Sequence, residues 1–155
     1  MEQSGPVLAE GVREFLHRDH ARLDGLLDRF RDEPLGKDAQ VRRARWRDFE
    51  AALLGHMAAE EKYLFTAFGM VHTEEAASLR AQHAELRRLL AVAGSVLDAE
   101  GAALKALTVA LRDHARQEDD LLYAWAQGAD LSAAEDLIRD ISERPAGGDA
   151  GFARR

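Results

Sequence analysis

Two short segments of the sequence repeat one spacing of polar residues within an apolar pattern. The first is His56-x-x-x-Glu60 and the second is His114-x-x-x-Glu118. A spacing of four residues places both side chains of a pair on one face of a helix. Apolar residues recur upstream of each pair in steps of three and four, so each His and each Glu occupies a position of the buried stripe. These upstream residues are Trp46, Phe49 and Leu53 in the first segment and Leu104, Leu107 and Leu111 in the second.

Two further histidines also interrupt apolar stripes. His20 lies between Leu16 and Leu23 at helical spacing, and His83 holds the corresponding place in a later segment. A buried carboxylate without a partner is costly, and a buried imidazole needs at least a hydrogen bond. One such histidine is usually a hydrogen-bonded core residue. Four in phase, two of them with a glutamate one turn later, indicate a shared metal site.

The composition favours helix along the whole chain. Only three prolines occur in 155 residues, while Ala, Leu, Glu and Arg, which favour helices, are abundant. The length suits one domain, which we expect to span residues 1–144, followed by a disordered tail at 145–155. The periodicity predicts an all-α, up-down-up-down four-helix bundle with a short fifth helix at its C-terminal end. The predicted helices cover residues 7–30, 38–68, a segment beginning after Thr73, residues 102–127, and residues 132–143.

Particular residues are expected to set the ends of these helices. Gly69 suits the C-cap of the second helix, and Thr73 suits the N-cap of the third. The sequence Ser132-Ala-Ala-Glu135 is typical of a capping box that opens the fifth helix.

Charge and composition exclude several classes of protein. The net charge of −7 argues against nucleic-acid binding, which needs a basic surface. The chain has no cysteine, so disulfides, zinc–thiolate sites and cysteine-ligated iron–sulfur clusters are excluded. No apolar run approaches the length of a membrane span, and the N-terminus lacks a signal segment. We therefore expect a cytoplasmic protein without membrane or nucleic-acid partners, as a monomer or weak homodimer.

The ligand types narrow the choice of metal. In a four-helix bundle, one seam histidine from each long helix and two glutamates would converge in the core, which is more than one ion usually needs. Two ions bridged by two carboxylates would use all six side chains. Imidazole with carboxylate suits iron, manganese or zinc, whereas calcium and magnesium prefer oxygen ligands alone. This chemistry favours iron, and manganese and zinc remain open.

Four motifs taken together resemble the hemerythrin-like (HHE cation-binding) family over roughly residues 10–127. The resemblance implies a four-helix bundle around a non-haem di-iron centre, bridged by two carboxylates and a solvent oxygen. By that match His20 and His56 hold one iron, His83 and His114 hold the other, and Glu60 and Glu118 bridge them. The motifs are His20, His56-x-x-x-Glu60-Glu61, His83-Ala-Glu-Leu and His114-x-x-x-Glu118-Asp119.

The sequence departs from the oxygen-carrying hemerythrins at two positions. The carriers have a histidine four residues after the third-helix histidine, where this chain has Arg87. They also place their last carboxylate five residues after its histidine, a position held here by Asp119. The resemblance therefore implies a second iron with fewer nitrogen ligands and an exchangeable position. Arg87 itself is expected to extend to solvent.

Several neighbouring residues have two interpretations. Glu61 and Asp119 are expected to be solvated or to contact the ligands from outside, with Asp119 a possible substitute for Glu118. Tyr63 is either a core aromatic or a proton donor near the metals. The remaining residues are expected to lie at the rim or surface, and they are His17, Asp24, His72 and the basic run Arg42–Arg47 around a buried Trp46.

Three functions fit these residues. The first is binding of O2, NO or peroxide at the iron pair. The second is an enzyme of the catalase or peroxidase type that consumes peroxide or oxygen at the open position. The third is iron storage or sensing, with a fold that depends on metal occupancy. The sequence leaves open whether the protein is an enzyme.

Overall fold

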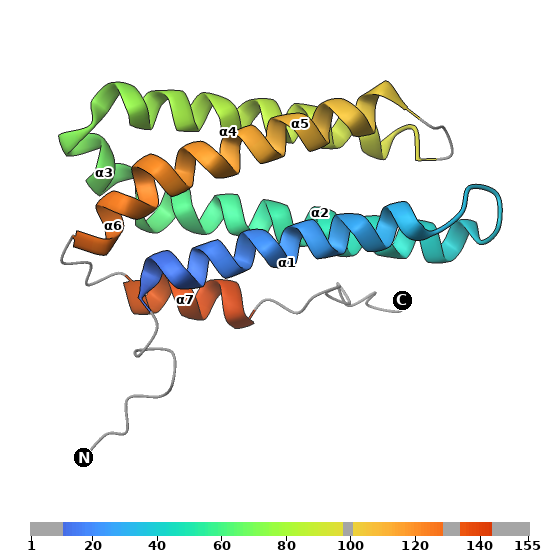
Figure 1. The fold of residues 1–155 in the computed structure, drawn as a ribbon, viewed down its shortest axis with the longest axis horizontal. Coiled ribbons are helices and arrows are strands. Elements are labelled where there is room, and N and C mark those ends of the chain that lie inside the picture. The colour runs from blue at the N-terminus through green and yellow to red at the C-terminus, as the bar shows by residue number, and fades with distance from the viewer. Residues whose placement is uncertain (1–10, 98–100, 129–133, 144–155) are drawn as a thin grey trace, which may run out of the picture.

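The computed structural model describes residues 11–97, 101–128 and 134–143, and within these ranges every regular element is helical. The prediction of an all-α protein is confirmed. Figure 1 shows the long helices lying along the long axis of the molecule, with α1 beside α2 and α4 beside α5. The long helices are α1 (Val12–Asp32), α2 (Ala39–Tyr63), α4 (Thr73–Gly94) and α5 (Ala102–Gln117). The shorter elements are α3 (Phe65–Val71), the π-helix η2 (Glu118–Tyr123), α6 (Ala124–Gly128) and α7 (Ala134–Glu143), which packs mainly on α2.

The connection between α1 and α2 follows the local sequence. Glu33 is extended (φ −77°, ψ 116°), as expected for a residue before proline, and it ends α1. Gly36 has a φ of 77°, the left-handed conformation that favours glycine. Asp38 caps α2, since its carboxylate accepts hydrogen bonds from the backbone N–H groups of Gln40 and Val41, both at 3.1 Å. These residues set the start of the helix that carries His56.

The predicted second helix is interrupted at one residue. Instead of running to Phe68, α2 ends at Tyr63, and Leu64 (φ −117°, ψ −43°) separates it from α3. Leu64 and Phe65 are both fully buried. Consecutive residues on a straight helix point about 100° apart, and the break lets both side chains enter the core. Gly69 lies inside α3 and is not a C-cap, so that prediction was wrong.

The predicted fourth helix also changes its geometry. The chain is α-helical to Gln117, forms a π-helical turn from Glu118 to Tyr123, and then continues as α6. In an α-helix that buries Glu118, the next buried positions would include Leu121 or Leu122 and then Trp125. The observed buried residues are Leu122, Tyr123 and Ala126, because the wider turn shifts the register by one residue.

The N-cap of α4 lies one residue before the position that the sequence predicts. Thr73 is the first residue of α4 and not its N-cap, and its hydroxyl donates to the Gly69 carbonyl at 3.0 Å. His72 occupies the cap position and stacks on Phe68, with 4.9 Å between ring centroids. The expected start of the first helix at Val7, the capping box at Ser132 and the tail after residue 144 lie outside the described residues.

The core consists of two apolar clusters with a polar layer between them. One cluster surrounds Trp46 and Phe49, and the other surrounds Phe65 and Phe68. Along α1, Leu16 belongs to the second cluster and Leu23 to the first, so the residue between them, His20, lies where the two clusters meet. On α4, His83 likewise lies between Leu79 of the second cluster and Leu86 of the first. His114 follows Leu111 of the first cluster and precedes Leu122 of the second, which lies in η2.

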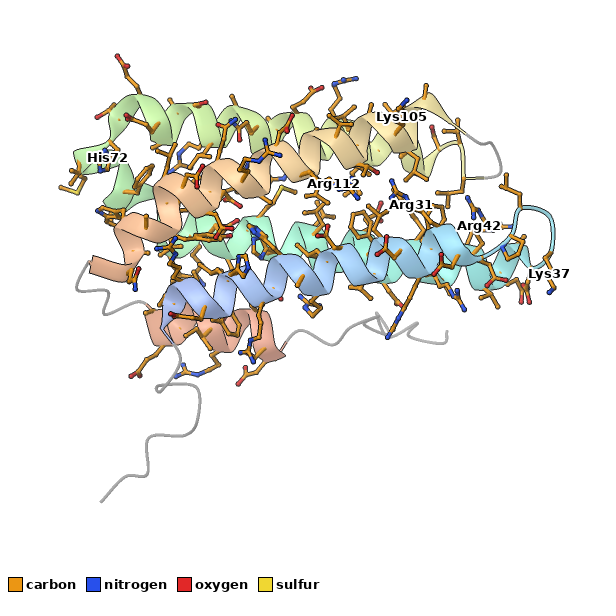
Figure 2. The ribbon with its side chains drawn as sticks, in the orientation of Figure 1. Arg31, Lys37, Arg42, His72, Lys105 and Arg112 are labelled. Atoms are coloured by element: carbon orange, nitrogen blue, oxygen red, sulfur yellow. The ribbon has the colours of Figure 1, made fainter. Side chains whose placement is uncertain are left out.

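The basic run on α2 is partly structural. Arg42 is only 7% exposed and donates to three backbone carbonyls, those of Leu97 (2.9 Å), Phe30 (3.3 Å) and Glu33 (2.7 Å). Its guanidinium also lies 4.2 Å from the centre of the Phe30 ring. In Figure 2, Arg42 lies at the end of the molecule opposite His72. Arg42 therefore joins α1, α2 and the turn after α4, which is not the arrangement of an exposed nucleic-acid contact.

Within the parts of the chain that the structure describes, no helix combines the length and apolarity that crossing a bilayer requires.

Replacing Arg42 tests this structural role. Arg42→Ala should lower the free energy of unfolding by about 2 kcal/mol, because three carbonyl groups lose a charged donor in a mostly buried setting. Arg43→Ala is the matched control, since Arg43 is exposed and donates to a carbonyl of its own helix, that of Ala39. Urea unfolding followed by circular dichroism measures both variants. Equal stability of the two would contradict the assignment.

Candidate metal centre

The structure brings all six predicted site residues into one buried layer. Five of them are at most 4% exposed, and the side chain of His20 is 11% exposed. Each long helix contributes one histidine, α2 adds a glutamate, and η2 adds the second glutamate directly after α5. The six residues are His20, His56, Glu60, His83, His114 and Glu118.

One group of donors involves α1, α2 and η2. His20 Nε2 lies 3.2 Å from Glu118 Oε1, and His56 Nε2 lies 4.0 Å from the same oxygen. His56 Nε2 also lies 3.0 Å from Glu60 Oε1. His20, His56 and Glu118 each offer one ligand atom, and these three atoms all lie within 4.8 Å of one another. These atoms are close enough to bind a common ion.

A second group involves α2, α4, α5 and η2. The Nε2 atoms of His83 and His114 are 3.1 Å apart, and His114 Nε2 lies 3.0 Å from Glu118 Oε1. His83 Nε2 is 3.6 Å from Glu60 Oε1 and 3.5 Å from Glu118 Oε2. One ligand atom from each of these four residues also lies within 4.8 Å of the others. Glu118 belongs to both groups. Two adjacent donor sets therefore share one carboxylate.

Three of the imidazoles are oriented by partners on a neighbouring helix. The Nδ1–H group of His56 donates to Asp19 Oδ2 at 2.7 Å. The Nδ1–H group of His114 donates to Gln82 Oε1, also at 2.7 Å. The Nδ1–H group of His83 donates to Glu61 Oε1 at 2.8 Å. Such contacts fix the ring and direct Nε2 toward the centre, where its lone pair would serve a metal ion in place of a proton.

Arg87 contacts the site through Glu61. Its Nη1 atom lies 2.7 Å from Glu61 Oε1 and its Nη2 atom lies 3.0 Å from Oε2, which is a bidentate pair. Arg87 thus does not simply extend to solvent. Burial raises the pKa of the Glu61 carboxyl, but Arg87 and His83 outweigh burial and lower the pKa from its ordinary value. Glu61 therefore remains an anion that accepts from His83.

The tyrosine at the centre is Tyr123, and sequence reasoning had considered Tyr63 instead. Tyr63 donates to Asp140 Oδ2 on α7 at 2.7 Å. The Tyr123 hydroxyl lies 2.8 Å from Glu60 Oε2 and 2.9 Å from His20 Nε2. Of the two interpretations of Tyr63, the structure supports the core aromatic, because Tyr63 is half-buried against the cluster of Phe65 and Phe68, and the donor near the metals was wrong. The π-helical turn places Tyr123 on the seam instead.

The remaining candidates lie at the edge of the site. Asp119 accepts a hydrogen bond from the exposed His17 at 3.0 Å and does not replace Glu118. Asp24 is exposed, one turn beyond His20. These positions agree with the expectation that His17 and Asp24 are rim residues.

The two glutamates have opposite pKa shifts. Burial and the charge of Glu118 raise the pKa of Glu60 above its ordinary value. Burial also acts to raise the pKa of Glu118, but the imidazoles of His114, His20 and His83 outweigh it and hold the pKa well below the usual range. Two carboxylates this close do not both ionise easily without added positive charge. A cation between them would supply that charge.

The buried histidines respond to the same carboxylates. Burial lowers the pKa of His56, yet Glu60, Asp19 and Glu118 outweigh burial and raise the pKa well above 6.5. The pKa of His83 is also raised, with Glu118 and Glu60 opposing burial. Without a metal, protons on these rings compensate the carboxylates.

The donor set fits a metal ion. Three buried polar atoms in the described residues have no hydrogen-bond partner, namely His20 Nδ1, Glu60 Oε1 and Glu118 Oε2. The two carboxylate oxygens lie within the convergent layer, where a cation would satisfy them. Imidazole nitrogens with carboxylate oxygens match first-row transition metals better than calcium or magnesium.

Comparison with family models decides the classification. The model described as "Hemerythrin HHE cation binding domain" matches residues 12–126. The chain belongs to the hemerythrin HHE cation-binding family. Searches of curated proteins and of solved structures found no match. The HHE match begins at the first residue of α1 and ends within α6, so it includes every residue of the candidate metal centre.

Three residues of this HHE domain were missed by sequence reasoning, namely Asp19, Gln82 and Tyr123. Asp19 and Gln82 directly precede the seam histidines of their own helices, and each reaches the histidine of the next long helix. A polar residue beside a core histidine was the available signal. Tyr123 gave none, because its position depends on the π-helical turn.

Removing the charge of Asp19 tests the electrostatics of the metal-free protein. Because the pKa of His56 is raised on folding, its protonated form stabilises the fold below pH 6.5, and this contribution is lost as pH rises through the folded pKa. Asp19→Asn should reduce stability at pH 6 by about 2 kcal/mol and should flatten the decline at higher pH. Asp24→Asn is the control on the same helix. Chelator-treated protein unfolded with urea between about pH 6 and 9 gives the profiles, and identical slopes in all three proteins would contradict the role of Asp19.

Removing Glu61 tests the orientation of His83. Glu61→Ala should weaken metal binding by about 10- to 100-fold, because His83 loses the acceptor that directs its ring. Glu85→Ala is the control, since Glu85 is exposed and forms an equivalent pair with Arg88 on α4. Competition with a chromogenic chelator measures the affinities. Unchanged affinity in Glu61→Ala would show that this contact does not support the metal site.

Proposed function

We propose that this HHE domain is an up-down-up-down four-helix bundle that holds two iron ions and binds a small molecule, O2, NO or peroxide, at them. His20 and His56 would hold one ion, and His83 and His114 would hold the other. Glu60 and Glu118 would be shared between the two. The family description supports cation binding, and the rest of the proposal depends on the geometry of the donors.

The observation that carries the proposal is the shared glutamate. Glu118 belongs to both donor groups, and each group has two histidines of its own. A single ion would leave two buried imidazoles and the far side of a buried carboxylate without compensation. Two ions satisfy all six side chains at once. The proximity of Glu60 Oε1 to both His56 and His83 supports a second shared carboxylate.

The choice of iron follows from the chemistry of the donors. Two histidines and two shared carboxylates supply fewer donors to each ion than a six-coordinate iron accepts, so exchangeable positions remain for a small molecule. When bound, iron supplies Lewis acidity and a redox change. The protein supplies oriented imidazoles, fixed carboxylates and apolar clusters on both sides that limit water. Manganese and zinc share part of this ligand preference and serve as alternatives in the test.

Metal analysis followed by gas exposure tests the proposal. Protein expressed in iron-rich medium should contain about two iron atoms per chain. Glu118→Gln should contain at most half the iron of the wild type, because the shared ligand loses its charge. Asp120→Asn should retain the wild-type content, since Asp120 is an exposed acid in the same turn.

Rapid mixing of the reduced protein then distinguishes binding from turnover. A reversible absorbance change with O2 or NO is expected. Sustained consumption of peroxide with evolution of gas would instead assign the protein as an enzyme of the catalase type. One iron per chain, or zinc in place of iron, would overturn the di-iron proposal.

A further inference from the structure

Tyr123 has an unusual environment for a buried tyrosine. Its side chain is fully buried. Among the residues that the structure describes, its hydroxyl contacts four candidate metal ligands. These contacts are His20 Nε2 (2.9 Å), His56 Nε2 (3.2 Å), Glu60 Oε2 (2.8 Å) and Glu118 Oε1 (3.3 Å).

The four distances are those expected between neighbouring ligands of one ion. Two donors bound at about 2.1 Å and at right angles lie about 3.0 Å apart. The separations from the Tyr123 oxygen to the two imidazole nitrogens and the two carboxylates range from 2.8 to 3.3 Å. The contact between His20 Nε2 and Glu118 Oε1, at 3.2 Å, falls in the same range. The phenolic oxygen is therefore placed as one more donor in the first group.

The π-helical turn is the element that puts it there. In an α-helix, residues five apart are rotated by about 140° from each other, so Glu118 and Tyr123 would face different sides. In η2 the hydrogen bonding runs from residue i to residue i+5, and both side chains are buried in the same layer. Such turns are often found at functional sites.

We infer that Tyr123 is a direct ligand of the ion held by His20 and His56. This inference rests on the proposed metal centre and adds a ligand to it. On coordination the phenolic O–H bond breaks, an oxygen–metal bond forms and the proton leaves to solvent, with no change in oxidation state. A phenolate oxygen prefers a hard trivalent cation, which is the ferric state for iron. The first ion then has one more protein ligand than the second, and the exchangeable positions lie mainly on the ion held by His83 and His114.

The chain offers a matched control, because Tyr63 and Tyr123 are its only tyrosines. Metal-free wild type, Tyr123→Phe and Tyr63→Phe are titrated with gallium(III), supplied as its nitrilotriacetate complex. Ultraviolet difference spectra report the conversion of tyrosine to tyrosinate, and metal analysis reports binding. Gallium undergoes no redox change, so the measurement is independent of iron and of any reaction with oxygen.

The expected result is loss of one tyrosine signal on binding to the wild type and to Tyr63→Phe, with no such change in Tyr123→Phe. The ferric proteins should agree, with a visible charge-transfer band and enhanced tyrosinate vibrations in resonance Raman spectra of all but Tyr123→Phe. Gallium bound by the wild type without tyrosinate would overturn the inference and leave the proposed function standing. No binding of gallium or iron by the wild type would overturn both.

Discussion

The burial of charge in one layer of the core is the constraint on which the structure depends. Four imidazoles and two carboxylates lie between two apolar clusters, where water cannot compensate them. Two adjacent buried carboxylates compete for the same positive charge. The pKa of Glu60 is therefore raised while the pKa of Glu118 is lowered. In the metal-free chain, protons on His56 and His83 provide that charge. Metal ions would displace those protons, so metal binding and protonation oppose each other at this layer.

A second set of contacts surrounds this layer and connects the helices. On four of the five elements that carry the site, namely α1, α2, α4 and η2, a polar residue directly beside a site residue reaches a histidine of another element. The contacts connect α1 to α2, α2 to α4, α4 to α5 and η2 back to α1, so they form a closed ring. Each contact joins two elements, and the three that hold His56, His83 and His114 also couple the orientation of a candidate ligand to the packing of the fold. The four contacts are Asp19–His56, Glu61–His83, Gln82–His114 and Asp119–His17.

The sequence predicted the parts of the site that follow from helical phase. His20, His56 and Glu60 interrupt apolar stripes, and phase alone placed them in the core. Phase also assumes a straight α-helix, and the predictions were wrong where the backbone departs from one. Burial of both Leu64 and Phe65 requires a break in the helix. The apolar stripe of one straight helix does not predict that break. The π-helical turn likewise brings Tyr123 into the core. Such a turn depends on tertiary packing, so helix propensities along the sequence do not predict it.

The asymmetry of the ring bears on the chemistry of the two halves of the site. His56 is held by the carboxylate of Asp19, which also pairs with Arg22, whereas His114 is held by the neutral amide of Gln82. A carboxylate partner makes an imidazole a stronger donor than an amide does. The other half also has one carboxylate-held imidazole, because His83 is held by Glu61, which pairs with Arg87. The halves therefore differ in Gln82 on one side and in Tyr123 on the other. With Tyr123 as the inferred ligand, the half with His20 and His56 would have one donor more and would suit a higher oxidation state, and the half with His83 and His114 would have more room for exchange.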